Sequence, residues 1–89
     1  MDSRYEWDSG KAAENWLKHG VGFPDAAGVF EDPLAITVPD DYPNEVRSVA
    51  IGRGFLGTTL VVVYTWRGET IRIISARRAT RGERRAYEG

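Results

Sequence analysis

Apolar and polar positions along the second half of the chain predict a β-hairpin. The segments TTLVVVYTW (58–66) and ETIRIISAR (69–77) flank the pair RG at 67–68, which suits a tight two-residue turn. Both segments carry apolar residues on both faces, so we expect them in the middle of a sheet. With this turn, Arg72 lies mid-strand opposite Val63, where a charge without an anionic partner is costly.

The N-terminal third has the apolar spacing of helices. Asp8 suits an N-cap and Gly20 suits the position after the last turn of a helix over 9–19. The apolar positions that predict its buried face are Ala12, Ala13, Trp16 and Leu17. A second short helix is expected within 23–32, with Pro24 in its first turn. Its apolar stripe consists of Phe23, Ala26, Ala27 and Phe30.

Three more strands and a final helix complete the predicted layout. The strands are expected within 4–8, 33–39 and 46–54, the second of them followed by an acidic loop. Thr80 and Glu83 have the spacing of a capping box, so a helix is expected from residue 81 onward. We therefore expect one α+β domain over residues 1–89, with helices on a mostly antiparallel sheet.

Opposite charges separate between the two halves of the chain. Residues 1–46 carry three Lys or Arg and ten Asp or Glu, a net charge of −7. Residues 47–89 carry nine Arg and three Glu, a net charge of +6, and six of these arginines lie in the last eighteen residues. Arginine presents a fork that suits phosphate, so the asymmetry favours a site for a polyanion, most simply RNA. Alternatively, the two halves only neutralise one another, or the arginines form a solvated helix face.

The composition excludes several kinds of chemistry. The chain has no cysteine, which removes disulfides, thiolate metal sites and cysteine nucleophiles and fits a reducing cytoplasm. Its single histidine cannot build a multi-histidine metal site, and no phosphate-binding loop motif is present. Neither a signal peptide nor a membrane-spanning segment is recognisable, so we expect a cytoplasmic protein without metal or nucleotide cofactor.

Metal-free cleavage of RNA requires few side chains. A base takes the proton of the 2′-hydroxyl, cations stabilise the charge on the phosphoryl oxygens, and an acid protonates the leaving 5′-oxygen. The residues that could supply these groups are Lys18, His19, Arg47, Arg72, Arg77, Glu83, Arg84 and Tyr87. Further RNA contacts are expected from Arg67, Arg78 and Trp66, the last by stacking on a base.

The candidates also have structural interpretations. His19 could interact only with the carbonyl groups of a helix end, and Arg84 could be an exposed helix charge. Tyr87 could simply pack against the sheet. If Thr80 caps the last helix, Glu83 is occupied by that cap, and His19 becomes the preferred general base or acid.

Several separated stretches resemble the BrnT toxin family of bacterial type II toxin–antitoxin systems. These stretches are YEWD, KAAENWLKHGVGF, and RIISARRAT followed by ERRAYE, and they extend from about residue 5 to residue 88. The resemblance implies a single domain with a fold similar to RelE-type toxins. The recurrent polar positions of the family match Lys18, His19, Arg47, Arg72, Ser75, Arg77, Glu83, Arg84 and Tyr87.

The resemblance also implies an activity and a partner. BrnT proteins are ribonucleases that cut RNA independently of the ribosome and so halt translation. A cognate antitoxin, BrnA, carries a ribbon-helix-helix DNA-binding domain, neutralises the toxin and brings it to operator DNA as a complex. Two other functions are compatible with the arginines alone. One is a nucleic-acid-binding module without catalysis, and the other is an interaction domain for an acidic protein.

Overall fold

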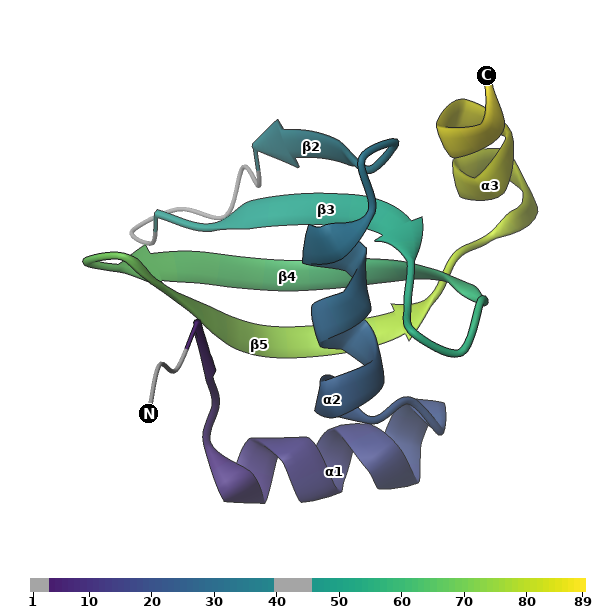
Figure 1. Cartoon of the computed structure of the whole chain (residues 1–89). Coiled ribbons are helices and arrows are strands. Elements are labelled where there is room, and N and C mark those ends of the chain that lie inside the picture. The colour runs from purple at the N-terminus through teal and green to yellow at the C-terminus, as the bar shows by residue number, and fades with distance from the viewer. Residues whose placement is uncertain (1–3, 40–45) are drawn as a thin grey trace.

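The computed structural model describes residues 4–39 and 46–89 and shows a five-stranded sheet with helices packed around it (Figure 1). The elements are β1 (Tyr5–Glu6), α1 (Ser9–His19), α2 (Phe23–Ala26), the 3₁₀ helix η1 (Ala27–Glu31), β2 (Ile36–Pro39), β3 (Ser48–Arg53), β4 (Thr59–Arg67), β5 (Thr70–Arg78) and α3 (Arg81–Glu88). The strand order is β1-β5-β4-β3-β2, and only β1 runs parallel to its neighbour. The predicted α+β class with a mostly antiparallel sheet is confirmed. The expected acidic loop after residue 39 lies outside the described residues.

The central hairpin turns one residue later than predicted. Arg67 pairs with Thr70, so the turn consists of residues 68–69. Gly68 adopts a φ of 61° there. Glycine reaches this left-handed conformation without steric cost, so the turn forms around Gly68 while Arg67 still extends the strand.

The later turn changes which side chains face each other on the sheet. Arg72 lies opposite Thr65, so the predicted pairing of Arg72 with Val63 is wrong. Val63 instead lies opposite Ser75, because a β-bulge leaves Ile74 as an extra residue in β5. Since Val63 and Thr65 are two residues apart on one strand, Arg72 and Ser75 lie on the same face of the sheet.

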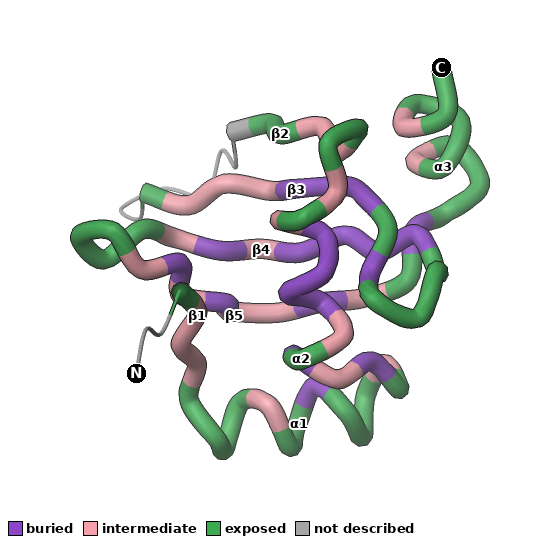
Figure 2. Tube along the Cα trace, viewed as in Figure 1, coloured by how far each residue is buried: buried purple, intermediate pink, exposed green. Residues whose placement is uncertain are grey.

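The main core lies on the face of the sheet that α2 and η1 cross (Figure 1). Phe23 and Val29 from these helices pack with Leu60, Val62 and Ile73 from the central strands. Figure 2 shows the crossing segment and most of β4 as buried, whereas much of α1 is exposed. The apolar stripe predicted for the second helix is therefore confirmed.

Three of the four α1 residues predicted to be buried, Ala13, Trp16 and Leu17, point to solvent, whereas Ala12 packs partly buried against the main core. Trp16 and Leu17 are 60% and 85% exposed, whereas Asn15 is only 6% exposed. Asn15 donates to the carbonyl oxygens of Val21 at 3.0 Å and Ala76 at 2.8 Å, and its Oδ1 accepts from the Ala76 N–H at 3.1 Å. Strand β1 pairs only with the start of β5, so the later backbone groups of this edge need another partner. Asn15 supplies it, and this requirement sets the rotation of the helix.

Helix α3 packs on the opposite face of the sheet. Its predicted capping box is confirmed, because the Thr80 hydroxyl accepts from the Glu83 N–H and the Glu83 carboxylate accepts from the Thr80 N–H. Ile51, Val61 and Ala79 form a second buried cluster beneath the helix. Helix α3 lies at the end of the sheet away from the hairpin turn (Figure 1), so it covers only part of this second face.

Candidate functional site

Two adjoining hollows lie on the second face of the sheet and along its β5 edge. The first has a volume of about 250 Å³ and is lined by Lys11, Val46, Arg47, Thr65, Arg67, Arg72 and Ile74. The second has a volume of about 240 Å³ and is lined by Lys11, Glu14, Asn15, Lys18, His19, Ile74 and Ser75. Lys11 and Ile74 line both hollows, and we call the combined feature the cationic groove.

The cationic groove collects positive charge from separate parts of the chain. Helix α1 contributes Lys11 and Lys18, whereas the sheet and the segment before β3 contribute Arg47, Arg67 and Arg72. Among the described residues that line it, Glu14 is the only one with a carboxylate. The structure therefore brings five of the residues expected from the sequence into one feature. These are Lys18, His19, Arg47, Arg67 and Arg72.

Arg72 has the anionic partner that its position on the strand requires. Its guanidinium donates to Oε2 of Glu6 across 2.8 Å. The parallel pairing of β1 with β5 brings the two residues together, because Glu6 and Arg72 are register partners. The remaining N–H groups of the guanidinium can donate to an anion while the Glu6 contact fixes its orientation.

Lys18 and His19 lie in the last turn of α1, at the β5 edge of the groove. Gly20 ends the helix with a φ of 67°, which confirms the predicted glycine stop. One turn earlier, Asn15 joins the helix to the backbone of β5. Lys18 is exposed and His19 is partly buried, so both side chains can reach a ligand that lies along the strand.

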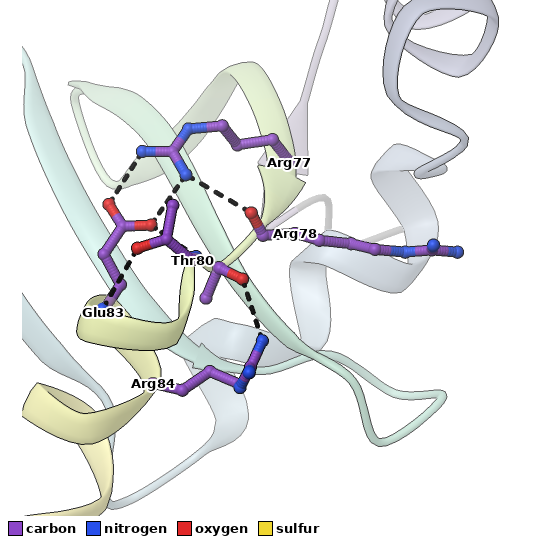
Figure 3. A network of polar contacts seen from close by, with 6 residues as sticks. Arg77, Arg78, Thr80, Glu83 and Arg84 are labelled. Carbon is purple, nitrogen blue, oxygen red and sulfur yellow. Dashed lines mark hydrogen bonds and ion pairs between the residues drawn. The ribbon is translucent and has the colours of Figure 1, made fainter.

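Arg77 and Glu83 form a network that joins β5 to α3 (Figure 3). The two guanidinium nitrogens of Arg77 donate to the two carboxylate oxygens of Glu83 at 2.7 and 2.8 Å, and the Thr80 N–H donates to the same carboxylate at 2.8 Å. The hydrogen bonds from Arg77 are the main reason that the pKa of Glu83 falls to about 2. A carboxylate that is so strongly acidic and fully engaged is a poor general base.

The pH dependence of stability tests this network. Because the pKa of Glu83 lies below its ordinary value of 4.5, its charge stabilises the folded state above that pH, and the contribution is lost as the pH falls toward about 2. We expect Glu83→Gln to lower the free energy of unfolding at neutral pH by roughly 0.5–2 kcal/mol, as for loss of a helix cap. As the pH falls toward about 2, the free energy of unfolding of Glu83→Gln should become nearly equal to that of the wild type.

Urea unfolding at neutral and at acid pH measures the free energy of unfolding of the wild type and of Glu83→Gln. Glu88→Gln is the matched control, since it neutralises an exposed carboxylate at the other end of α3. This control should leave the pH dependence unchanged. An equal loss for Glu83→Gln at every pH would show that the charge of Glu83 does not stabilise the fold.

Arg84 and Tyr87 also hold α3 and lie outside the lining of the groove. Arg84 donates to the Ala79 carbonyl at 3.3 Å. The Tyr87 hydroxyl donates to Oδ2 of Asp32 at 2.6 Å, and the same oxygen accepts from the Arg53 N–H at 2.9 Å. The contact with Asp32 raises the pKa of Tyr87 and lowers the pKa of Asp32. The structural interpretation of Tyr87 as a packing residue therefore fits its position.

Trp66 and Arg78 lie on the other side of the sheet from the cationic groove. Trp66 lines a separate hollow that also contains the carboxylates of Glu31 and Glu69. Arg78 lines another hollow, beside α1. The structure does not bring either side chain to the arginines of the groove.

Some residues of the site were not anticipated from the sequence. Lys11 and Lys18 are seven positions apart and share a helix face, so helical spacing could have identified Lys11. Glu6 could not be found in this way, because its contact with Arg72 depends on a parallel pairing between the two ends of the chain. Asn15 is polar and lies outside the apolar stripe predicted for this helix, yet it is the residue that α1 buries.

Neither a metal centre nor a membrane helix is found in the described part of the chain. Within residues 4–39 and 46–89, no group of three or more His, Cys, Asp or Glu side chains could hold a metal ion. No helix in these ranges is long and apolar enough to cross a membrane.

Comparison with known proteins identifies the family. The family profile described as "Ribonuclease toxin, BrnT, of type II toxin-antitoxin system" matches residues 7–83. Among solved structures, the chain is similar to the crystal structure of the Brucella abortus ribonuclease toxin BrnT, with a TM-score of 0.71 and 25% identity over 90% of this chain and 100% of that chain. No curated protein matches significantly. The profile spans most of the chain, from before α1 into α3, and the chain therefore belongs to the BrnT family of ribonuclease toxins of type II toxin–antitoxin systems.

Proposed function

We propose that the cationic groove binds single-stranded RNA and that the protein cleaves this RNA without a metal ion, which inhibits translation. The observation that carries the proposal is the convergence of Arg47, Arg67 and Arg72 with Lys18 and His19 in one groove. Family membership supplies the class of activity, and the groove is the surface whose charge suits an RNA backbone.

Arg72 is our proposed contact to the phosphate that is cut. It lies on a central part of the sheet, and its ion pair with Glu6 holds the guanidinium in a fixed direction. Cations that are already oriented stabilise the extra negative charge of the phosphoryl oxygens without reorganising during the reaction. Arg47 and Arg67 line the same hollow and would hold the neighbouring phosphates.

His19 is our proposed acid or base, with Lys18 beside it. In the reaction, the 2′-oxygen loses its proton to a base and forms a bond to phosphorus while the bond from phosphorus to the 5′-oxygen breaks. The departing 5′-oxygen takes a proton from an acid, so the products are a 2′,3′-cyclic phosphate and a 5′-hydroxyl. Glu83 is bound by Arg77 and Thr80, which leaves the end of α1 as the better source of proton transfer.

A type II toxin has a protein antitoxin, and we propose that the cognate antitoxin here is of the BrnA type. In this proposal the antitoxin carries a ribbon-helix-helix domain, neutralises the toxin in the cytoplasm, and connects it to operator DNA. Purification of the complex from co-expressing cells, followed by binding to the operator with and without toxin, tests this part. Operator binding by toxin alone would contradict it.

The first experiment is cleavage of a defined single-stranded RNA by the purified toxin in EDTA. We expect cleavage to persist and the product ends to be 2′,3′-cyclic phosphates, with His19→Ala slower by roughly 10²–10⁴-fold, as is typical for loss of a general acid or base. A wild-type enzyme that requires added divalent metal would contradict the metal-free mechanism.

The salt dependence of RNA binding gives a second check. If Z phosphates are neutralised in the groove, the logarithm of the binding constant should fall against the logarithm of salt concentration with a slope of roughly −0.7Z. Arg47→Gln and Arg67→Gln should each make this slope shallower. Salt-sensitive binding with no product at all would favour the non-catalytic binding module instead.

A further inference from the structure

An apolar patch lies on the outer side of α1 and the neighbouring β3–β4 loop, away from the cationic groove. Its members are Trp16, Pro24, Phe55 and Leu56, which line an open hollow of about 640 Å³. Trp16, Phe55 and Leu56 are 60%, 65% and 83% exposed. Adjacent large apolar side chains on a soluble surface are typical of a site where another molecule binds.

The apolar patch is held rigidly although it contributes little to the core. Asp25 accepts from the Leu56 N–H at 2.9 Å through its carboxylate and from the Phe55 N–H at 3.1 Å through its carbonyl. A Cβ atom on Gly28 would lie 2.4 Å from the Phe55 nitrogen, so the loop sits directly on η1. A loop whose backbone is already held in place loses less entropy on binding, which favours a specific partner over a loose contact.

The charge around the apolar patch indicates what the partner carries. Arg78 lines the hollow, and its side chain extends away from the Arg77–Glu83 pair (Figure 3). Within the described residues this guanidinium has no hydrogen bond or ion pair, whereas the Asp25 carboxylate is already used by the Leu56 N–H. Of the charged side chains among the described residues that line the hollow, Arg78 is therefore the one with donors left for a ligand, and it suits a mainly apolar ligand that carries a carboxylate.

We propose that the cognate antitoxin docks on the apolar patch through an apolar segment with an acidic residue that pairs with Arg78. This inference rests on membership of a toxin–antitoxin family, but not on the proposed RNA chemistry. An RNA backbone does not fit the patch, because Trp16, Phe55 and Leu56 offer apolar surface and the groove cations lie elsewhere. The antitoxin is thus anchored outside the RNA groove, and the two functions are separable by mutation.

The test compares antitoxin affinity and RNA cleavage for the same purified variants. The variants Trp16→Ser and Leu56→Ser should each weaken binding of the purified cognate antitoxin about thirtyfold or more, as for truncation of a central interface residue. Their rates of RNA cleavage should equal the wild-type rate. Leu34→Ser is the matched control, because Leu34 is 70% exposed and does not line this hollow, and it should change neither quantity.

Each result decides the proposal. Wild-type antitoxin affinity in both patch variants, with circular dichroism showing that they are folded, overturns it. Parallel loss of RNA cleavage and antitoxin binding also overturns it, because the patch would then serve RNA. If the wild type cuts no RNA, the proposed function fails, yet the affinity measurements still test the docking surface on their own.

Discussion

Arg72→Ala should lower the rate of RNA cleavage by roughly 10²–10³-fold, the effect of removing one preorganised donor from a developing anion. Arg72 is the groove cation whose direction is fixed by a described ion pair, so its charge is already aimed when RNA arrives. The fold should survive the change, because Glu6 is 38% exposed at its side chain and can be rehydrated. Single-turnover cleavage of a defined RNA measures the rate, and thermal unfolding of each variant measures the stability of the fold.

Two further substitutions separate the guanidinium from the ion pair. Arg72→Lys keeps the charge but loses the planar fork, so we expect an intermediate rate. Glu6→Gln removes the ion pair while Arg72 stays, and it should lower the rate far less than Arg72→Ala. If Glu6→Gln lowered the rate as much as Arg72→Ala, the cause would be the lost contact between β1 and β5, and not the missing guanidinium. A wild-type rate for Arg72→Ala would remove Arg72 from the site.

Local signals in the sequence predicted the elements well because their causes are local. The capping box at Thr80 and Glu83 is a contact across three positions, and the structure contains it. The hairpin was also predictable, although its turn formed at Gly68 one residue later. Either turn leaves the strands apolar on both faces, so the hydrophobic pattern alone could not choose between the two registers.

Contacts between distant segments explain what the sequence could not predict. From the sequence, all three arginines of β5 were candidates for one RNA site, but Arg72 faces the groove and meets Glu6, whereas Arg77 is bound by Glu83. Arg78, the next residue, points to the other side of the sheet. Alternation along a strand separates these neighbours, and only the register of the sheet shows which of them face the site.

The exposed face of α1 is the largest conflict between sequence pattern and structure. Trp16 and Leu17 have the spacing of a core stripe, yet the helix buries Asn15. Such conflicts are expected where a surface has a function that the isolated fold does not need. An interface for a second protein would explain why apolar residues are retained where the chain itself does not cover them.

Asn15→Ala should reduce the free energy of unfolding by about 3 kcal/mol or more. In the wild type, the carbonyl groups of Val21 and Ala76 and the Ala76 N–H bond to Asn15 in a buried position. The change leaves these three backbone groups without that hydrogen-bond partner. Each buried group left without a partner costs about 1–3 kcal/mol, against a total stability of about 5–15 kcal/mol for a typical domain. Loss of helix propensity cannot cause the effect, because alanine is the better helix former.

Urea unfolding measures the loss, and Glu14→Ala is the control because it also replaces a side chain of α1 with alanine, at an exposed neighbour. The control should stay within about 0.5 kcal/mol of wild type. Asn15→Asp keeps an acceptor for the Ala76 N–H but loses both donated bonds, so it should also be strongly destabilised.

The folded fraction of Asn15→Ala should cleave RNA poorly as well, since Asn15 fixes the end of α1 that carries His19. A stability for Asn15→Ala equal to wild type would show that α1 is held by its other contacts, and that the position of His19 beside β5 does not depend on this amide.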